Sequence, residues 1–230
     1  MPSTVFVEQL LDCVRRLALL AALIAAGVSD YRTREVDDKI WLAGGLAAAP
    51  PLLYLYAKGF YAPELHLFSL LLALLVALLI QLARLAGEAD AVALVFIGLF
   101  EPPTRVAPLC LMPPATAVVA AGVLALLYTL WNAAENVRRG ALEALEGQSL
   151  PVKIAALLTM RYVTREEYLA KQHMYTPSSG ERGEPLLSIA VKQLENLPRA
   201  ERFWASVLLP YVTLLAAGLL IYNLLCFLTG

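Results

Sequence analysis

The chain has 230 residues, of which 60% are hydrophobic and only 16% are charged, and its formal net charge is −1. Ordinary soluble domains are about 45–50% apolar and about 25% charged, so this chain cannot cover its own surface with polar side chains. These figures exclude a soluble enzyme, a disordered chain and a nucleic-acid-binding protein, and they indicate that lipid is the main solvent.

Six apolar runs follow one another along the chain, separated by charged or proline-rich stretches. Backbone groups in lipid must form hydrogen bonds within their own segment, and Leu- and Ala-rich runs without period-two alternation therefore predict helices rather than a barrel. We expect an all-α polytopic membrane protein with about six transmembrane helices. The runs cover residues 5–28, 40–57, 65–83, 91–100, 115–131 and 203–228.

The fourth run is the shortest, since its helix would reach only about 15 Å, and Pro102 and Pro103 follow it. It either crosses with the help of flanking residues or turns back. If it crosses, 14 of the 18 Lys and Arg residues lie on one side, which the positive-inside rule assigns to the cytoplasm. We expect a membrane domain over residues 1–131, a cytoplasmic helical loop region over 132–202 and a final transmembrane helix over 203–230.

Charged residues interrupt the start of the first run. Glu8, Asp12 and Arg16 recur every four residues and so share one face of a helix. Either Asp12 and Arg16 pair inside a helix bundle, or this segment is an amphipathic leader that lies on the membrane surface.

The three cysteines are far apart and each lies in an apolar stretch: Cys13, Cys110 and Cys226. We interpret them as small buried hydrophobic residues. The sequence has no C-x-x-C pair and its two histidines are far apart, so we expect no metal site.

Two aspartates lie directly against apolar runs. Asp30 ends the first run and Asp90 begins the fourth, with two predicted crossings between them. Two crossings return the chain to the side from which it started. Asp30 and Asp90 must therefore lie on the same side of the membrane, whichever side is cytoplasmic, and ionisable residues in such positions are functional candidates.

Two neighbouring carboxylates can share one proton, because close like charges cannot both ionise cheaply. One then takes a proton from water as general base, while the other donates a hydrogen bond to a carbonyl. Asp30 follows a helix, where the helix dipole disfavours an anion, and Asp90 precedes one, where it favours an anion. The dipoles alone predict that Asp90 is the ionised base and Asp30 its protonated partner.

The sequences around both aspartates resemble those of a known family. Ser29-Asp-Tyr-Arg-Thr-Arg-Glu-Val-Asp-Asp-Lys-Ile-Trp41 resembles the first active-site segment of archaeal preflagellin and prepilin peptidases, and Gly87-Glu-Ala-Asp90 resembles their G-x-G-D motif. Two positions depart from the pattern, with Ala89 at the second Gly and Val92 where many relatives carry Lys.

The resemblance implies an aspartic endopeptidase in the plasma membrane, with six transmembrane helices and the catalytic residues Asp30 and Asp90 on the cytoplasmic side. It implies no metal and no cofactor. The implied partners, besides the bilayer, are class III leader-bearing precursors of pilin-like proteins or archaeal flagellins, from which such enzymes remove a short basic leader.

Further residues near the two aspartates are candidates for binding substrate or shaping the site. Small residues next to Asp90 would let a peptide backbone approach, and acidic residues would attract a basic leader or belong to a solvated loop. A nearby arginine would anchor at lipid headgroups or hydrogen-bond near the pair. These candidates are Gly87, Glu88, Ala89, Arg34, Asp37 and Asp38.

Two functions from other classes compete with a peptidase. A proton-coupled transporter would use Asp30 and Asp90 as proton carriers, but transporters of this kind show inverted halves and helix breaks at mid-membrane, and the sequence shows no half-repeat. A non-catalytic membrane scaffold would present residues 132–202 to partners.

Overall fold

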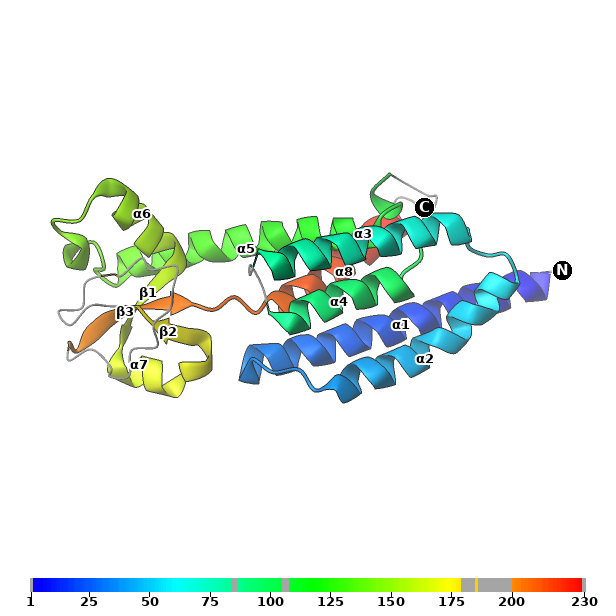
Figure 1. Cartoon of the computed structure of the whole chain (residues 1–230), viewed down its shortest axis with the longest axis horizontal. Helices are drawn as coiled ribbons and strands as arrows, with labels where there is room; N and C mark the ends of the chain where they lie inside the picture. The colour runs from blue at the N-terminus through cyan, green and yellow to red at the C-terminus, as the bar shows by residue number, and fades with distance from the viewer. Residues whose placement is uncertain (1, 84–86, 105–107, 179–184, 186–199, 229–230) are drawn as a thin grey trace. The chain divides into compact units, whose positions relative to one another are not determined.

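The computed structural model describes residues 2–83, 87–104, 108–178, 185 and 200–228. These residues divide into two compact units, one made of residues 1–123 and 210–230, the other of residues 124–209. The first unit is a helix bundle (Figure 1), and one of its helices, α5, continues into the second unit. Its elements are α1 (Pro2–Thr33), α2 (Asp38–Ala57), α3 (Pro63–Leu82), α4 (Glu88–Phe100), the short helix η1 (Pro108–Cys110), the start of α5 (Pro113–Arg138) and α8 (Tyr211–Leu228).

The bundle confirms the predicted all-α membrane class. Four helices, α2, α3, α5 and α8, are long and apolar enough to cross a membrane. Helix α1 packs on α2 and α8, and α4 packs on α3 and α8, so both belong to the same bundle. The count of six spans stays a prediction, because α1 carries charges and α4 has only 13 residues.

Small residues allow the helices of the bundle to approach closely. A Cβ atom added at Gly218 of α8 would lie 2.3 Å from the carbonyl oxygen of Ala117 in α5. Lipid is as apolar as leucine, so helices in a membrane associate through such close packing instead of through the hydrophobic effect. Gly218 is therefore a contact point that holds α8 against α5.

A buried ion cluster links α1 to the end of α4. The Arg15 guanidinium is fully buried and lies 2.9 Å from Glu101 and 2.6 Å from Asp12, while Arg16 lies 3.0 Å from Asp12. Arg15 also donates to the carbonyl oxygen of Phe100. The cluster confirms the pairing of Asp12 with Arg16 inside a bundle and excludes a free surface leader for this segment.

The interpretation of the cysteines as three buried hydrophobic residues was wrong. Cys110 and Cys226 form a disulfide, with their Cα atoms 5.8 Å apart, and Cys13 is an exposed free thiol. The pairing joins η1 to the end of α8, which are 116 residues apart in the chain. Only the return of α8 to the bundle brings the two sulfurs together, so spacing gives no sign of it.

The second unit contains a small sheet, which corrects the prediction of a purely helical loop region over 132–202. Its three antiparallel strands are arranged in the order β1-β3-β2, and Met160 of β1 pairs with Ser206 of β3. No local hairpin signal exists for partners so far apart in sequence. The elements are the end of α5, η2 (Glu143–Leu145), α6 (Leu150–Thr159), β1 (Met160–Thr164), α7 (Arg165–Ala170), η3 (Gln172–Met174), β2 (Tyr175–Pro177) and β3 (Arg202–Val207).

The final apolar run divides into two elements and is not one helix over 203–228. Residues Arg202–Val207 form the central strand of the sheet, where Phe203 and Trp204 are fully buried. Helix α8 begins after Pro210, at Tyr211. Aromatic and β-branched residues favour a strand before this proline, and the fixed φ of proline suits the start of a helix.

We expect Glu101→Gln to destabilise the protein by about 3–5 kcal/mol, because it removes the fully buried carboxylate that pairs with Arg15 and leaves that buried cation only the partly exposed Asp12. Thermal unfolding of the purified protein in detergent measures the effect. The double variant Arg15→Met/Glu101→Leu should unfold at a higher temperature than Glu101→Gln. Lys39→Gln is the matched control, since the Lys39–Asp37 pair is exposed and contributes at most about 1 kcal/mol. Equal melting temperatures for Glu101→Gln and Lys39→Gln would contradict a stabilising cluster.

Candidate active site

The bundle brings Asp30 and Asp90 to the same end, as the count of crossings predicted. Asp30 lies in the last turn of α1 and is only 8% exposed, and Asp90 lies in the first turn of α4 and is half-buried. Figure 1 shows the end of α1 and the start of α4 at one end of the bundle, with the start of α1 and the end of α8 toward the other. The two carboxylates are close enough to interact electrostatically.

Arg34 ends α1 and places a cation beside Asp30. Its φ of 60° puts it in the left-handed region, and its N–H donates to the carbonyl oxygen of Asp30 at 3.0 Å. This conformation costs a residue with a side chain roughly 1–2 kcal/mol. The same reversal of the chain carries the guanidinium back to 3.8 Å from Asp30 Oδ1. The other oxygen, Oδ2, is buried and has no hydrogen-bond partner among the residues that the structure describes.

Side-chain hydroxyls fix the turn between α1 and α2. Ser29 Oγ donates to the carbonyl oxygen of Glu35 at 2.8 Å, and Thr33 Oγ1 donates to the Ser29 carbonyl oxygen at 2.9 Å. Asp37 then caps α2, since it accepts a hydrogen bond from the Lys39 N–H at 2.9 Å. The polar residues of this turn therefore have structural roles that hold the end of α1 in place.

Asp90 closes the first turn of its own helix. Its Oδ2 accepts a hydrogen bond from the N–H of Gly87, the N-cap residue, at 2.8 Å. Gln81 of α3 donates to the Gly87 carbonyl oxygen at 2.9 Å and ties this end to the neighbouring helix. Gly87 has φ −76° and ψ 169°, an extended conformation open to any residue, so the turn itself does not require glycine here.

The start of α8 completes the site, and sequence reasoning missed it. The backbone of Val212 lies close enough to interact with both carboxylates, and that of Thr213 interacts with Asp30. The Thr213 hydroxyl donates to the Gly27 carbonyl oxygen at 2.7 Å. A helix N-terminus directs free N–H groups and a partial positive charge at its neighbours. Pro210 before an apolar run was the one signal that a helix starts here.

The other predicted site residues, at the starts of α4 and α2, differ in how exposed they are. Glu88 and Asp38 are exposed at the starts of α4 and α2, and Ala89 is half-buried against the bundle core. Within the described part of the chain, none of these three forms a hydrogen bond or an ion pair with Asp30 or Asp90. They form the rim of the site, and Arg34, Gly87 and the start of α8 form its wall.

The charges around the pair favour a different proton arrangement from the one that the dipoles of α1 and α4 predict. Arg34 stands beside Asp30, and the positive end of α8 faces it as well. Nearby positive charge stabilises a carboxylate. Together these groups favour negative charge on Asp30.

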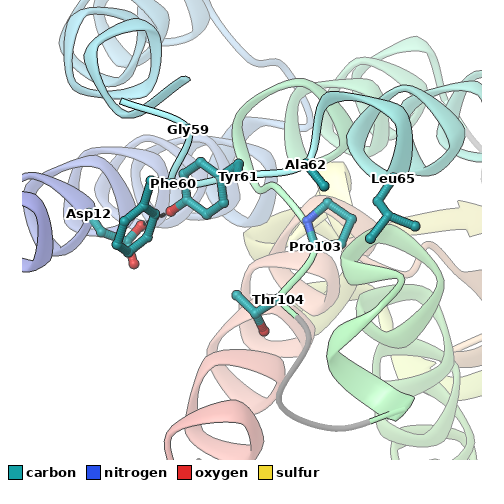
Figure 2. A pocket seen from close by; sticks show the side chains of 8 residues that line it. All are labelled: Asp12, Gly59, Phe60, Tyr61, Ala62, Leu65, Pro103 and Thr104. Atoms are coloured by element: carbon teal, nitrogen blue, oxygen red, sulfur yellow. Dashed lines mark hydrogen bonds between the residues drawn. The ribbon is translucent and has the colours of Figure 1, made fainter. Parts of the chain in front are cut away.

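A separate cavity of about 460 Å³ lies far from the two aspartates. Figure 2 shows its lining, in which the Tyr61 hydroxyl points at Asp12, to which it donates a hydrogen bond. Asp12 precedes Asp30 by 18 residues of the same helix, which is about 27 Å. The cavity therefore belongs to the opposite end of the bundle, beside the ion cluster. Its lining is Asp12, Gly59, Phe60, Tyr61, Ala62, Leu65, Pro103 and Thr104.

Within the ranges that the structure describes, no group of three or more His, Cys, Asp or Glu side chains is placed to hold a metal ion. The candidate site consists of two carboxylates, one guanidinium and backbone amides. Such groups can activate water and polarise a carbonyl.

The type IV leader peptidase family matches residues 17–130 of the chain. The match covers α1 from its middle to its end, α2, α3, α4 and most of α5, and therefore includes both aspartates. No curated protein matches the chain.

We expect Gly27→Leu to push the start of α8 away from α1, because a Cβ atom at Gly27 would lie 3.0 Å from the Thr213 Cα atom, and backbone cannot rotate aside. Overpacking of this kind costs about 1–3 kcal/mol. Thermal unfolding in detergent measures it. Gly122→Leu is the matched control, since a Cβ there meets nothing within 4 Å. An unchanged melting temperature for Gly27→Leu would show that α8 does not pack at this point.

Proposed function

We propose, from the premise that residues 17–130 belong to the type IV leader peptidase family, that this membrane protease is an aspartic endopeptidase. Its substrates would be class III leader-bearing precursors of pilin-like proteins or archaeal flagellins, and it would remove their short basic leaders at the cytoplasmic face of the plasma membrane. The juxtaposition of Asp30 and Asp90 at one end of the bundle is the observation that carries this proposal.

In the proposed reaction Asp30 is the ionised general base and Asp90 carries the shared proton. Asp30 takes a proton from water, and the water oxygen attacks the scissile carbonyl carbon. Asp90 donates its proton to the carbonyl oxygen, which gives a neutral tetrahedral diol. The diol collapses when Asp30 passes its proton to the amide nitrogen, Asp90 takes a proton back from one diol hydroxyl and the C–N bond breaks. These steps release the leader and restore the pair.

The fixed groups around the pair suit these roles. The Gly87 N–H binds Oδ2 of Asp90, so Oδ1 would carry the proton in this reaction. Oδ2 of Asp30 has no hydrogen-bond partner among the described residues, which suits the acceptance of a proton from water. Arg34 holds the negative charge on Asp30 before the reaction. Proton carriers of a transporter would lie nearer the middle of the membrane, so the position of both residues at helix ends supports the peptidase.

The rim of the site suits a basic leader peptide. Glu35, Asp38 and Glu88 are exposed at the end of the bundle that carries Asp30 and Asp90. Fixed carboxylates at a cleft raise the local concentration of a cationic substrate. They would hold the basic leader while the bond that follows it reaches the pair.

The disulfide supports a cytoplasmic position for the site. Cys226 lies 14 residues after Val212 on α8, about 21 Å along the helix, at the end of the bundle away from the aspartates. Disulfides persist in oxidising compartments, outside the cytoplasm. An outward disulfide leaves Asp30 and Asp90 on the inner side, in agreement with the distribution of Lys and Arg.

We expect Asp30→Asn and Asp90→Asn each to reduce cleavage of a leader-bearing precursor by at least about 100-fold, because an amide can neither take a proton from water nor donate an acidic one. Gel analysis of purified protein incubated with the precursor measures the effect. Glu64→Gln, which changes an exposed carboxylate at the start of α3, is the control and should cleave within a few-fold of the parent. Near-normal cleavage by either variant of the pair would exclude the aspartic mechanism.

We expect Arg34→Gln to reduce the cleavage rate about tenfold, because a hydrogen bond or ion pair to a charged group contributes roughly 1.5–3 kcal/mol. Arg32→Gln is the matched control, since Arg32 is exposed two residues earlier. Single-turnover rates with a precursor peptide compare the two variants. Equal rates for both would mean that Arg34 does not hold the charge of Asp30.

We expect Gln172→Cys to resist, and Lys58→Cys to accept, an impermeant maleimide added to intact cells. Both positions are exposed, and Lys58 lies in the turn between α2 and α3. The background variant is Cys13→Ser, because the other two cysteines are bonded to each other. Labelling of Gln172→Cys but not of Lys58→Cys would mean that the protein has the opposite orientation in the membrane.

A further inference from the structure

The short helix α6 of the second unit has an outward stripe of apolar side chains. Leu150 is 69% exposed, Ile154 is 49% exposed and Leu158 is partly exposed. They recur every four residues and so lie one above the other on the helix. Ala156, on the opposite side, is fully buried in the core of the unit. The stripe is therefore not the face by which α6 packs on its own unit.

Two asparagines fasten the end of α6 to α5. Asn132 Nδ2 donates to the carbonyl oxygen of Met160 at 2.8 Å. Asn136 Nδ2 donates to the carbonyl oxygens of Leu157 at 3.0 Å and Met160 at 2.7 Å. Both asparagines are buried and lie one turn apart on α5. The last carbonyl groups of α6, which have no partner inside their own helix, are thus bound by the end of α5.

The length of α5 indicates where this attachment point lies relative to the membrane. Trp131 lies 18 residues after Pro113, at about 27 Å along the helix, which matches the hydrocarbon thickness of about 30 Å. Trp131 is 53% exposed, and its ring lies 5.8 Å from that of Tyr128. Exposed Trp and Tyr rings are typical of the membrane–water interface. Asn132, the next residue, therefore binds the end of α6 at the level of this aromatic pair.

Arg161 of strand β1 places a cation beside the same part of α5. The Arg161 guanidinium lies over the Trp131 ring, 5.2 Å from its centroid. Arg161 directly follows Met160, the residue at the end of α6. Strand β1 and the end of α6 therefore both contact α5 next to its Tyr128–Trp131 pair.

We propose that α6 is an interfacial helix, which lies in the headgroup region of the bilayer that α5 crosses and inserts Leu150, Ile154 and Leu158 among the lipids. Helices of this kind bury an apolar face about 5–10 Å into the boundary between headgroups and acyl chains. Three side chains on one short helix are too few for a protein–protein interface, which takes roughly 20–30 residues a side. Lys153, beside the stripe, can extend its ammonium to the phosphates.

A spin label at position 154 tests this inference on the full chain. Ile154→Cys, in the Cys13→Ser background, carries a nitroxide after reconstitution into phosphatidylcholine–phosphatidylglycerol vesicles. Power saturation then compares access of oxygen, which concentrates in lipid, with access of a water-soluble nickel chelate. Glu146→Cys, exposed in the turn before α6, is the control. Leu150→Cys repeats the measurement on the same stripe.

We expect the ratio of oxygen access to nickel access to be several-fold higher at positions 150 and 154 than at position 146. Equal ratios at the three positions would place the stripe in water and overturn the inference. Protection of positions 150 and 154 from both reagents would also overturn it, because a second copy or another part of this chain would then cover α6. No outcome depends on peptidase activity, so the test is independent of the proposed function.

Discussion

The buried pair of Arg15 and Glu101 sets the register of α1 against α4, and the position of the two aspartates depends on that register. A charge buried without its partner costs several kcal/mol, so the two helices cannot slide past one another without breaking the cluster. Because α1 and α4 run in opposite directions, Asp30 lies about 22 Å from Arg15 and Asp90 about 16 Å from Glu101, both toward the same end. The proposed topology places Arg15 and Arg16 on the side where the positive-inside rule expects few cations, and the cluster pairs both of them with carboxylates within the bundle.

Helix α8 connects the two ends of this arrangement. At its start, Val212 and Thr213 meet the aspartates, and at its end Cys226 is bonded to Cys110. Close packing at Gly218 holds the helix between these points. The site therefore combines aspartates on α1 and α4 with positive groups from Arg34 and α8. That asymmetry is what two like residues need in order to take different roles in one reaction.

The second unit is a small sheet whose inner strand also leads into α8. Asn132 and Asn136 bind the carbonyl groups at the end of α6, and Asn136 Oδ1 also accepts a hydrogen bond from the Tyr162 N–H at 3.1 Å. These two asparagine side chains bind the backbone groups at the outer edge of β1, as a neighbouring strand would. This edge is therefore not open to pairing with another chain. Helix α5 thus both binds the end of α6 and covers the edge of β1.

The sequence by itself determined the class of the protein, the order of its apolar runs and the shared side of Asp30 and Asp90. These follow from the thickness of the bilayer and from counting crossings, which need no knowledge of neighbours. Only the tertiary structure decided that α8 adjoins the aspartates, that Arg34 turns back on Asp30, that Cys110 bonds to Cys226 and that Met160 pairs with Ser206. Each joins groups through packing between helices or strands, or through one backbone conformation at a helix end. Hydrophobic periodicity indicates which face of a segment is exposed to water or lipid, but it does not indicate which segments lie beside each other.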